Sequence, residues 1–480
     1  MIGAGNDTRI SPMGVDWMTV FIYILLVLVG WVSIYAAVYD DAHASIFDIS
    51  QRYGMQLAWI GVSLFIAVSI LLIDDKYWHI LAQPLYWISI LFLLGTFIFG
   101  REVNGARAWY EFGPVRIQPA EFVKITTSLV LARVMSSYSF NIHQPRSILS
   151  VFFFMGLPAI IIILQNDTGS ALVYASFLLM LYREGFSGWF YVALILVISL
   201  FVLSFYVNPL TLLILLIVFA VLAEGLMNGR WKTKLIYLSA VALGALGLYF
   251  GLRLGGVEIS AETSLLISVG VSMIFVAIYA YHQRLRNVWL VLLMFVGSFM
   301  FTQTIDYVFD NVLQIHQQKR ILDLLGLESD PSGWGYHVNQ SKIAIGSGGV
   351  LGKGFLNGTQ TKYDFVPEQS TDFIFCTIGE EWGFVGSTVV ILLFIVLILR
   401  LVAMGERQHE AFGRIYCYCV AGILLFHLVV NIGMTIGLMP VIGIPLPFVS
   451  YGGSSMIAFT ILLFIAIKLD SAKKSHITRI

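Results

Sequence analysis

Carboxylates that could carry chemistry gather in one polar stretch of the chain, residues 333–386. They are Glu368, Asp372 and the adjacent pair Glu380 and Glu381, and Asp372 is followed directly by Phe-Ile-Phe. A carboxylate at the boundary between a polar loop and an apolar surface loses hydration, which raises its pKa and suits it to act as a base. Asp372 is therefore the candidate catalytic base, and an N-cap of the next helix is its alternative role.

The same stretch supplies amides, cations and glycines that could bind an anionic substrate. Gln340, Lys342 and Glu368 are candidate substrate-binding residues. The run GSGGVLGKG at 346–354 is not a Walker phosphate loop, because it lacks the first glycine and the final Ser or Thr of that motif. Its glycines would either bring backbone N–H groups close to an anion or give flexible packing against the membrane.

A second charged loop, residues 100–124, carries several cations that include Arg107 and Arg116. Glu121 and Lys124 end this loop in the first turn of the next helix, where a spacing of three residues places them on one face. They could form a surface ion pair with a snorkelling lysine. Alternatively, Lys124 and Arg107 bind an anionic substrate beside a catalytic or metal-binding Glu121.

Four further polar positions lie at or between apolar segments. Asp167 would either cap the helix that follows it or line a cavity. The uncharged segment 437–455 has three prolines and carries Ser450, a candidate substrate-binding residue. Non-helical backbone at membrane depth is tolerated only in a protein-lined or wet cavity. We expect His427 and Asn431 to form hydrogen bonds within the helix bundle.

The composition is that of a membrane protein. The chain has 480 residues, of which 58% are hydrophobic and 12% charged, whereas a soluble domain carries about 25% charged residues. Its zero net charge gives no argument for a nucleic-acid partner. Three cysteines are too few for a disulfide framework, and neither they nor the nine histidines have metal-binding spacing.

Apolar runs of roughly 20 residues, each long enough to cross a bilayer, recur along the chain. They predict an all-α polytopic protein, with residues 1–480 forming a single integral membrane domain. We expect about fourteen membrane helices, at 17–39, 54–73, 78–99, 119–138, 148–165, 169–183, 188–206, 209–227, 235–252, 264–282, 288–303, 383–402, 412–436 and 454–469.

The Lys and Arg bias predicts the orientation of these helices. Most Lys and Arg residues lie inside if both termini are cytoplasmic. The loop 100–124 and the large loop 304–382 are then extracytoplasmic and hold most of the exceptions, which suggests a role for those charges outside. Residues 188–303 form an expanded block of five apolar segments with no apparent chemistry.

Several of these segments resemble the SEDS family of membrane proteins for cell elongation, division and sporulation. They are VNGARAW at 103–109, QPAEFVK at 118–124, NDTGSAL at 166–172, and the long segments 335–386 and 437–455. The GTQ at 358–360 and the ending LPFVSYGGSS are more similar to the elongation member than to the division member. Family members usually have ten membrane helices, so one helix here is expected to be replaced by the five in 188–303.

The resemblance implies a peptidoglycan glycosyltransferase of the bacterial cytoplasmic membrane. Such an enzyme polymerises lipid II into glycan strands on the outer face and releases undecaprenyl diphosphate. The family's essential aspartate matches Asp372, and its helix-four Glu and Lys match Glu121 and Lys124. The implied partner is a class B penicillin-binding protein, a transpeptidase of the elongation complex.

The residue types fit this chemistry. Asp372 would act as the base for the GlcNAc 4-hydroxyl, and Lys124, Arg107 and Lys342 would neutralise the diphosphate. Glu121 would orient Lys124 or hold a divalent cation, Mg²⁺ or Mn²⁺, and no other cofactor is expected. A lipid II flippase is the alternative, although it needs ionisable residues at mid-depth on several helices. A non-catalytic scaffold leaves the outer carboxylates unexplained.

Overall fold

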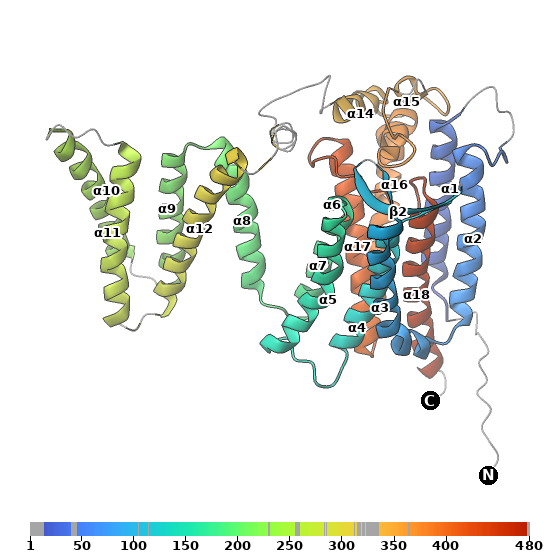
Figure 1. Cartoon of the computed structure of the whole chain (residues 1–480), viewed down its shortest axis with the longest axis horizontal. Helices are drawn as coiled ribbons and strands as arrows, with labels where there is room; N and C mark the ends of the chain where they lie inside the picture. Colours follow the sequence, from blue (N-terminus) through green and yellow to red (C-terminus); the bar gives the residue numbers. More distant parts are fainter. Residues whose placement is uncertain are drawn as a thin grey trace, which may run out of the picture. The chain divides into compact units, whose positions relative to one another are not determined.

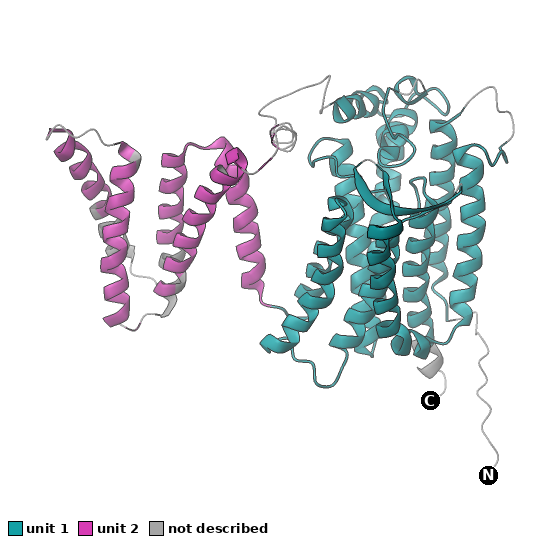
Figure 2. Ribbon diagram, viewed as in Figure 1, with its two compact units in different colours: residues 1–186, 326–480 teal, residues 187–325 magenta. Residues whose placement is uncertain are grey.

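The protein is mostly helical, as predicted. The computed structural model (Figure 1) describes residues 14–39, 46–103, 105–113, 115–228, 231–254, 260–282, 286–311, 336–362 and 365–477, together with the single residues 284, 313, 318 and 322. The chain divides into two compact units (Figure 2), residues 1–186 with 326–480, and residues 187–325. The second unit contains the predicted expanded block.

The first unit holds α1 (Trp17–Ala37), α2 (Arg52–Leu72), α3 (Asp75–Phe99), α4 (Pro119–Met135), α5 (Pro145–Leu164), α6 (Thr168–Leu172), η1 (Val173–Ser176), α7 (Phe177–Arg183), α14 (Tyr336–Ser347), α15 (Thr359–Lys362), α16 (Ile374–Glu406), α17 (Ala411–Thr435) and α18 (Gly453–Ile477). The second holds α8 (Gly188–Tyr206), α9 (Pro209–Asn228), α10 (Trp231–Leu254), α11 (Ala261–His282) and α12 (Arg286–Asn311).

Ten helices in the described part of the chain are long and apolar enough to cross a membrane. The shorter helix α4 is not among these ten; it carries Glu121, Lys124 and Arg133. The predicted helix 169–183 is divided into α6, η1 and α7. The exact count of fourteen membrane helices therefore stays a prediction.

The boundaries of the large loop differ from the predicted 304–382. Helix α12 continues to Asn311, and helical structure resumes at Ile374. Helix α16 is kinked at Gly383, the residue where the predicted membrane helix begins. Glu380 was expected in the loop but lies within α16, where hydrogen bonds from α15 and its flanks satisfy the carboxylate. The described part of the loop contains α14 and α15, and residues 323–335 lie outside the described residues.

A small antiparallel sheet in the loop 100–124 was not predicted. Its strands are β1 (Arg101–Val103), β2 (Ala106–Phe112) and β3 (Val115–Ile117), in the order β1-β2-β3. Tyr110 on β2 anchors the sheet to α3, because its ring stacks on Phe92 at a centroid distance of 4.8 Å and its hydroxyl donates to the Phe92 carbonyl oxygen at 2.9 Å. Alternating burial along β2 is the expected pattern of a half-covered strand.

Helix α17 lies at the centre of the first unit. It packs against α4, α7, α16 and α18, and most of its residues are buried. His427, Asn431 and Thr435 recur every four residues along it and are all buried, so they form a polar row on one face. Polar groups in such a core must find hydrogen-bond partners. His427 and Asn431 have theirs around the candidate site, whereas the Thr435 hydroxyl donates within its own helix.

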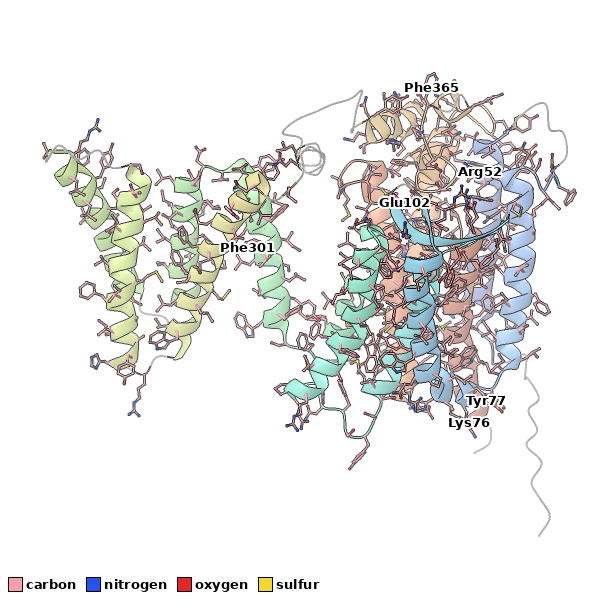
Figure 3. All side chains as sticks on the ribbon, viewed as in Figure 1. Arg52, Lys76, Tyr77, Glu102, Phe301 and Phe365 are labelled. Carbon is pink, nitrogen blue, oxygen red and sulfur yellow. The ribbon has the colours of Figure 1, made fainter. Side chains whose placement is uncertain are left out.

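One end of the first unit is fastened by charged side chains. Asp16 caps α1 by accepting from the Thr19 amide at 3.2 Å, and it also accepts from Arg400 at 2.5 Å and Arg407 at 3.0 Å. Arg407 in turn binds Asp470, so α1, α16 and α18 are held together. Figure 3 shows Lys76 at this end and Arg52 toward the opposite end.

Candidate active site

The candidate base Asp372 lies in a turn whose backbone is fixed by hydrogen bonds from other segments. Three consecutive carbonyl oxygens of this turn accept hydrogen bonds: Ser370 from the Tyr451 amide at 2.8 Å, Thr371 from the Ser450 hydroxyl at 2.6 Å, and Asp372 from the Asn431 amide group at 2.9 Å. The predicted candidates Asp372 and Ser450 are thus brought together. The predicted alternative role of Asp372 is not seen, because the N-cap of α16 is Phe373.

The surroundings of Asp372 suit it to hold a proton near neutral pH. Burial raises the pKa of its carboxyl group to about 7, and the like charges of Glu368 and Asp167 act in the same direction. The carboxyl group also faces Gly443, where a methyl group would lie 3.4 Å from Oδ2. A carboxyl group with such a pKa can accept a proton without leaving the physiological range.

Backbone strain is concentrated around this turn. Asn166, Glu368 and Phe448 are non-glycine residues with positive φ, at 63°, 52° and 65°. They come from three separate segments, and each of these segments carries a predicted site residue. Strain of this kind costs about 1–3 kcal/mol per residue and often marks functional sites.

Asp167 has the predicted role of a helix cap, and it also forms a hydrogen bond with Gln118. It caps α6 by accepting from the Ser170 amide at 3.1 Å, and its second oxygen accepts from the Gln118 side chain at 2.8 Å. Gln118 directly precedes α4, and its backbone amide donates to the Ser454 hydroxyl at 3.2 Å. Asp167 therefore links the start of α4 to the turn that begins α18.

The exposed cations Arg107 and Lys342 lie on different elements, β2 and α14. Arg107 is on β2, and its backbone amide donates to the Gln165 carbonyl oxygen at 3.0 Å. Lys342 is on α14 and lies directly over Gly437, the first residue of the segment 437–455. Gln340 is on the same helix and is half-buried. Both cations remain accessible to an anionic ligand.

Glu121 and Lys124 are not on the exposed surface of the site. Their side chains are 3% and 1% exposed, and Lys124 Nζ lies 2.9 Å from Glu121 Oε1. Lys124 also lies 3.2 Å from His427 Nε2 and 4.9 Å from the centre of the Phe459 ring. The structure therefore places this pair inside the bundle, where it touches the site only through other residues.

Arg52 is a site residue that sequence reasoning missed. Its guanidinium donates to the Ser370 hydroxyl at 2.6 Å, lies 3.8 Å from Glu368 Oε2 and faces the Tyr451 ring. Its side chain is 46% exposed. The orientation predicted from the positive charges puts Arg52 on the outer face, whereas most Lys and Arg residues lie on the inner side. This unusual location is a sequence signal that could have identified Arg52.

The glycine run 346–354 serves close packing rather than anion binding. The amides of Lys353 and Gly354 donate to the carbonyl oxygens of Glu380 and Glu381, each at 3.0 Å. A methyl group at Gly352 would overlap the Glu381 carbonyl oxygen. Gly348 and Gly352 let the loop lie directly on α16, and the amides of Gly348, Gly352 and Gly354 all donate to backbone carbonyl oxygens.

Glu380 fixes the next part of the loop. Its carboxylate accepts from the backbone amides of Thr359, Gln360 and Thr361 at 2.7, 2.9 and 3.0 Å, and from Lys353 Nζ at 2.7 Å. Both Glu380 and its neighbour Glu381 are buried. We therefore assign Glu380 to holding the loop rather than to catalysis.

Glu121 Oε1 is taken by the Lys124 ammonium group, and Oε2 has no hydrogen-bond partner among the described residues. Among the described residues, no group of three His, Cys, Asp or Glu side chains is arranged to hold a metal ion. A divalent cation at Glu121 therefore stays a prediction.

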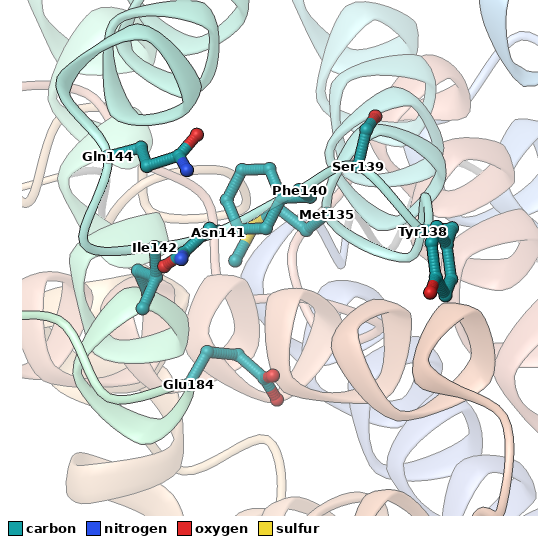
Figure 4. Close-up of a pocket in the computed structure, with 8 residues that line it drawn as sticks. All are labelled: Met135, Tyr138, Ser139, Phe140, Asn141, Ile142, Gln144 and Glu184. Carbon is teal, nitrogen blue, oxygen red and sulfur yellow. The ribbon is translucent and has the colours of Figure 1, made fainter.

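A pocket lies at the other end of α4 (Figure 4). It has a volume of about 480 Å³ and is lined by residues that include Met135, Tyr138, Phe140 and Glu184. None of the predicted site residues lines it, and Glu184 is engaged by Arg414 at 2.9 Å. The pocket is therefore separate from the candidate active site.

The chain matches a family model described as cell cycle protein, of the FtsW, RodA and SpoVE type, over residues 16–223 and 209–475. It is 33% identical to the peptidoglycan glycosyltransferase RodA of Treponema pallidum, across 92% of this chain and 94% of that protein. It is 29% identical to the peptidoglycan glycosyltransferase MrdB of Escherichia coli strain K12, across 94% and 93%.

A solved structure on the structural coordination of polymerization and crosslinking by a peptidoglycan synthase complex contains a similar chain. The TM-score is 0.57 at 26% identity, with 96% of this chain and 98% of that chain covered. The family match spans nearly all of the sequence and agrees with the SEDS motifs. The chain is therefore a multi-pass membrane protein that belongs to the FtsW, RodA and SpoVE family and, within it, is most like RodA.

Proposed function

We propose that this protein is a peptidoglycan glycosyltransferase that polymerises lipid II into glycan strands during cell elongation. The observation that best supports this function is the environment of Asp372. Its carboxyl group has a pKa raised to about 7, and three hydrogen bonds to backbone carbonyl oxygens fix the turn in which it lies. Fixed geometry and a matched pKa are the two requirements of a general base. The names of the relatives, both peptidoglycan glycosyltransferases, support the reaction class.

In the proposed reaction, Asp372 takes the proton of the GlcNAc 4-hydroxyl as that oxygen attacks the anomeric carbon of the second substrate. The bond from that carbon to the diphosphate breaks, and undecaprenyl diphosphate leaves with the electron pair. Direct displacement inverts the α-anomer to a β-linkage. The exposed cations Arg107 and Lys342 neutralise the leaving diphosphate, and Arg52 is suitably placed to assist.

The orientation follows from the charge bias. Both termini are proposed to lie in the cytoplasm, and the face with Asp372 to lie outside the cytoplasmic membrane of a bacterium. A class B penicillin-binding protein is the proposed partner. The solved relative supports this, because polymerization and crosslinking are coordinated there by one complex.

The test is polymerisation of purified lipid II by the purified protein, alone and with its penicillin-binding partner. Glycan ladders from the wild type that vanish in Asp372→Ala support the proposal, provided that the variant elutes as a monodisperse species like the wild type. A wild type that makes no ladder but moves lipid II across liposome membranes would instead identify a flippase. Repeating the assay with EDTA and with added Mg²⁺ or Mn²⁺ tests whether a divalent cation is needed.

A further inference from the structure

The two peptide planes that flank the Cα atom of Asp372 are held from two different parts of the chain, the segment 437–455 and helix α17. The plane before it is fixed by the Ser450 hydroxyl on the Thr371 carbonyl oxygen at 2.6 Å, and the plane after it by the Asn431 side chain at 2.9 Å. Fixing both planes fixes φ and ψ of Asp372, and hence the direction of its Cα–Cβ bond. The aim of the carboxyl group therefore depends on Asn431, a residue of α17.

Asn431 also fixes the segment that the carboxyl group faces. Its side-chain nitrogen donates a second hydrogen bond to the Ile444 carbonyl oxygen at 2.7 Å. Ile444 directly follows Gly443, which faces Asp372 Oδ2. One amide group thus sets the spacing between the candidate base and the opposite wall of the site, and Asn431 itself is fully buried.

His427, one turn earlier on α17, holds the next residue of the same segment. Its Nδ1 lies 3.0 Å from the Pro445 carbonyl oxygen, and its Nε2 lies 3.2 Å from Lys124 Nζ. A carbonyl oxygen only accepts, so Nδ1 carries the proton, and Nε2 accepts from the Lys124 ammonium group. The neutral imidazole therefore connects Lys124 to the wall of the site.

The Lys124 ammonium group has no free N–H group to donate to a substrate. Its three N–H groups are accounted for by Glu121 Oε1, His427 Nε2 and the face of the Phe459 ring. Lys124 is also only 1% exposed. An effect of this buried pair on the reaction must pass through His427 to the segment beside Asp372.

We propose that Asn431 and His427 are positioning residues for Asp372, anchored at the far end by the Glu121–Lys124 pair. This inference rests on the proposed glycosyltransferase function. Asn431 aims the carboxyl group, and Asn431 and His427 together hold the facing wall at a fixed distance, without touching the substrate. A misplacement of a catalytic group by about 1 Å can cost roughly 100-fold in rate.

The test compares Asn431→Leu with Thr435→Val in the full-length protein. Both positions are buried on the same face of α17, but the Thr435 hydroxyl donates only within its own helix, to the Ile432 carbonyl oxygen at 2.8 Å. Asn431→Leu should lower kcat for lipid II polymerisation by about 10- to 100-fold with KM changed by less than about 3-fold. Thr435→Val should match the wild type. Equal kcat in the two variants overturns the proposal.

His427 gives a second, graded comparison. His427→Leu removes both hydrogen bonds, whereas His427→Gln retains one donor and one acceptor, so the glutamine variant should keep clearly more activity. The Asn431 side-chain oxygen has no hydrogen-bond partner among the described residues. Replacement by Leu therefore removes one unsatisfied atom along with the donor, which limits its effect on folding. If Asn431→Leu still fails to fold, Asn431→Ala takes its place.

Amide hydrogen exchange on the same proteins, without substrate, separates this proposal from the proposed function. Faster exchange over residues 365–376 and at Tyr451 in Asn431→Leu, but not in Thr435→Val, supports the positioning role even if no variant polymerises lipid II. Unchanged exchange in Asn431→Leu overturns it. A wild type with no polymerising activity refutes the proposed function alone.

Discussion

Replacing Lys124 by Met should destabilise the protein strongly. The ammonium group lies 2.9 Å from Glu121 Oε1, and the two side chains are 1% and 3% exposed. Removal of one partner leaves the other as an uncompensated buried charge, which costs about 3–5 kcal/mol. The double variant Glu121→Gln, Lys124→Met removes both charges and should recover most of that loss. The size of the recovery measures the coupling between the two residues.

The assay is the free energy of unfolding in mixed micelles titrated with a denaturing detergent. Arg183→Met is the matched control, because its ion pair with Glu406 is exposed on both sides and should contribute little. The reasoning is refuted if Lys124→Met costs no more than Arg183→Met, or if the double variant is as unstable as the single one. Either result would mean that Lys124 is not buried against Glu121.

Three further substitutions test other parts of the site. Gly352→Ala should release the glycine loop from α16, because a methyl group at this position would overlap backbone atoms. Gly346→Ala is the control and should be neutral, because a methyl group there meets open space. Limited proteolysis of the loop compares the two variants. Glu380→Gln should expose the same loop to protease at a cost of about 1–3 kcal/mol, because buried amides lose a charged acceptor; equal digestion of variant and wild type would contradict this. Gly443→Ala should lower kcat, because its φ of 69° strains alanine and this segment faces Asp372; a normal kcat would show that this wall is tolerant.

Local sequence patterns were sufficient for much of the fold and for the identity of the candidate base. Asp372 could be singled out because it stands between a polar loop and an apolar helix, a feature of the sequence itself. Asp167 could be placed for the same reason, since a helix cap is a local signal. The long apolar runs predicted where most of the helices lie.

The depth of Lys124 could not be predicted in this way. Its spacing from Glu121 fits a surface pair and a buried pair equally well. The difference is made by His427, Phe459 and Pro445, which are more than three hundred residues away in sequence. Only tertiary packing brings them over the first turns of α4.

The glycine run shows the same limit. Its composition fits a loop around an anion as well as a loop that packs against a helix. The choice is made by α16, whose Gly383 has a φ of 64° and lies against the run. The small sheet escaped prediction because β1 and β3 have three residues each, too few to show a period of two.

The central claim is that Asp372 is a general base whose pKa is raised to about 7 by burial. Its active form is the carboxylate, which accumulates above that pH, so activity should be lost as the pH falls below it. The most direct test is the initial rate of lipid II polymerisation between pH 5.5 and 8.5, for the wild type and Asp372→Asn.

We expect kcat/KM of the wild type to fall by about tenfold per pH unit below about 7 and to level off above it. The kcat/KM of Asp372→Asn should be at least about 100-fold lower than that of the wild type and should not fall in this way below pH 7. A flat wild-type profile across this range, or an asparagine variant within a few-fold of the wild type, would contradict the account.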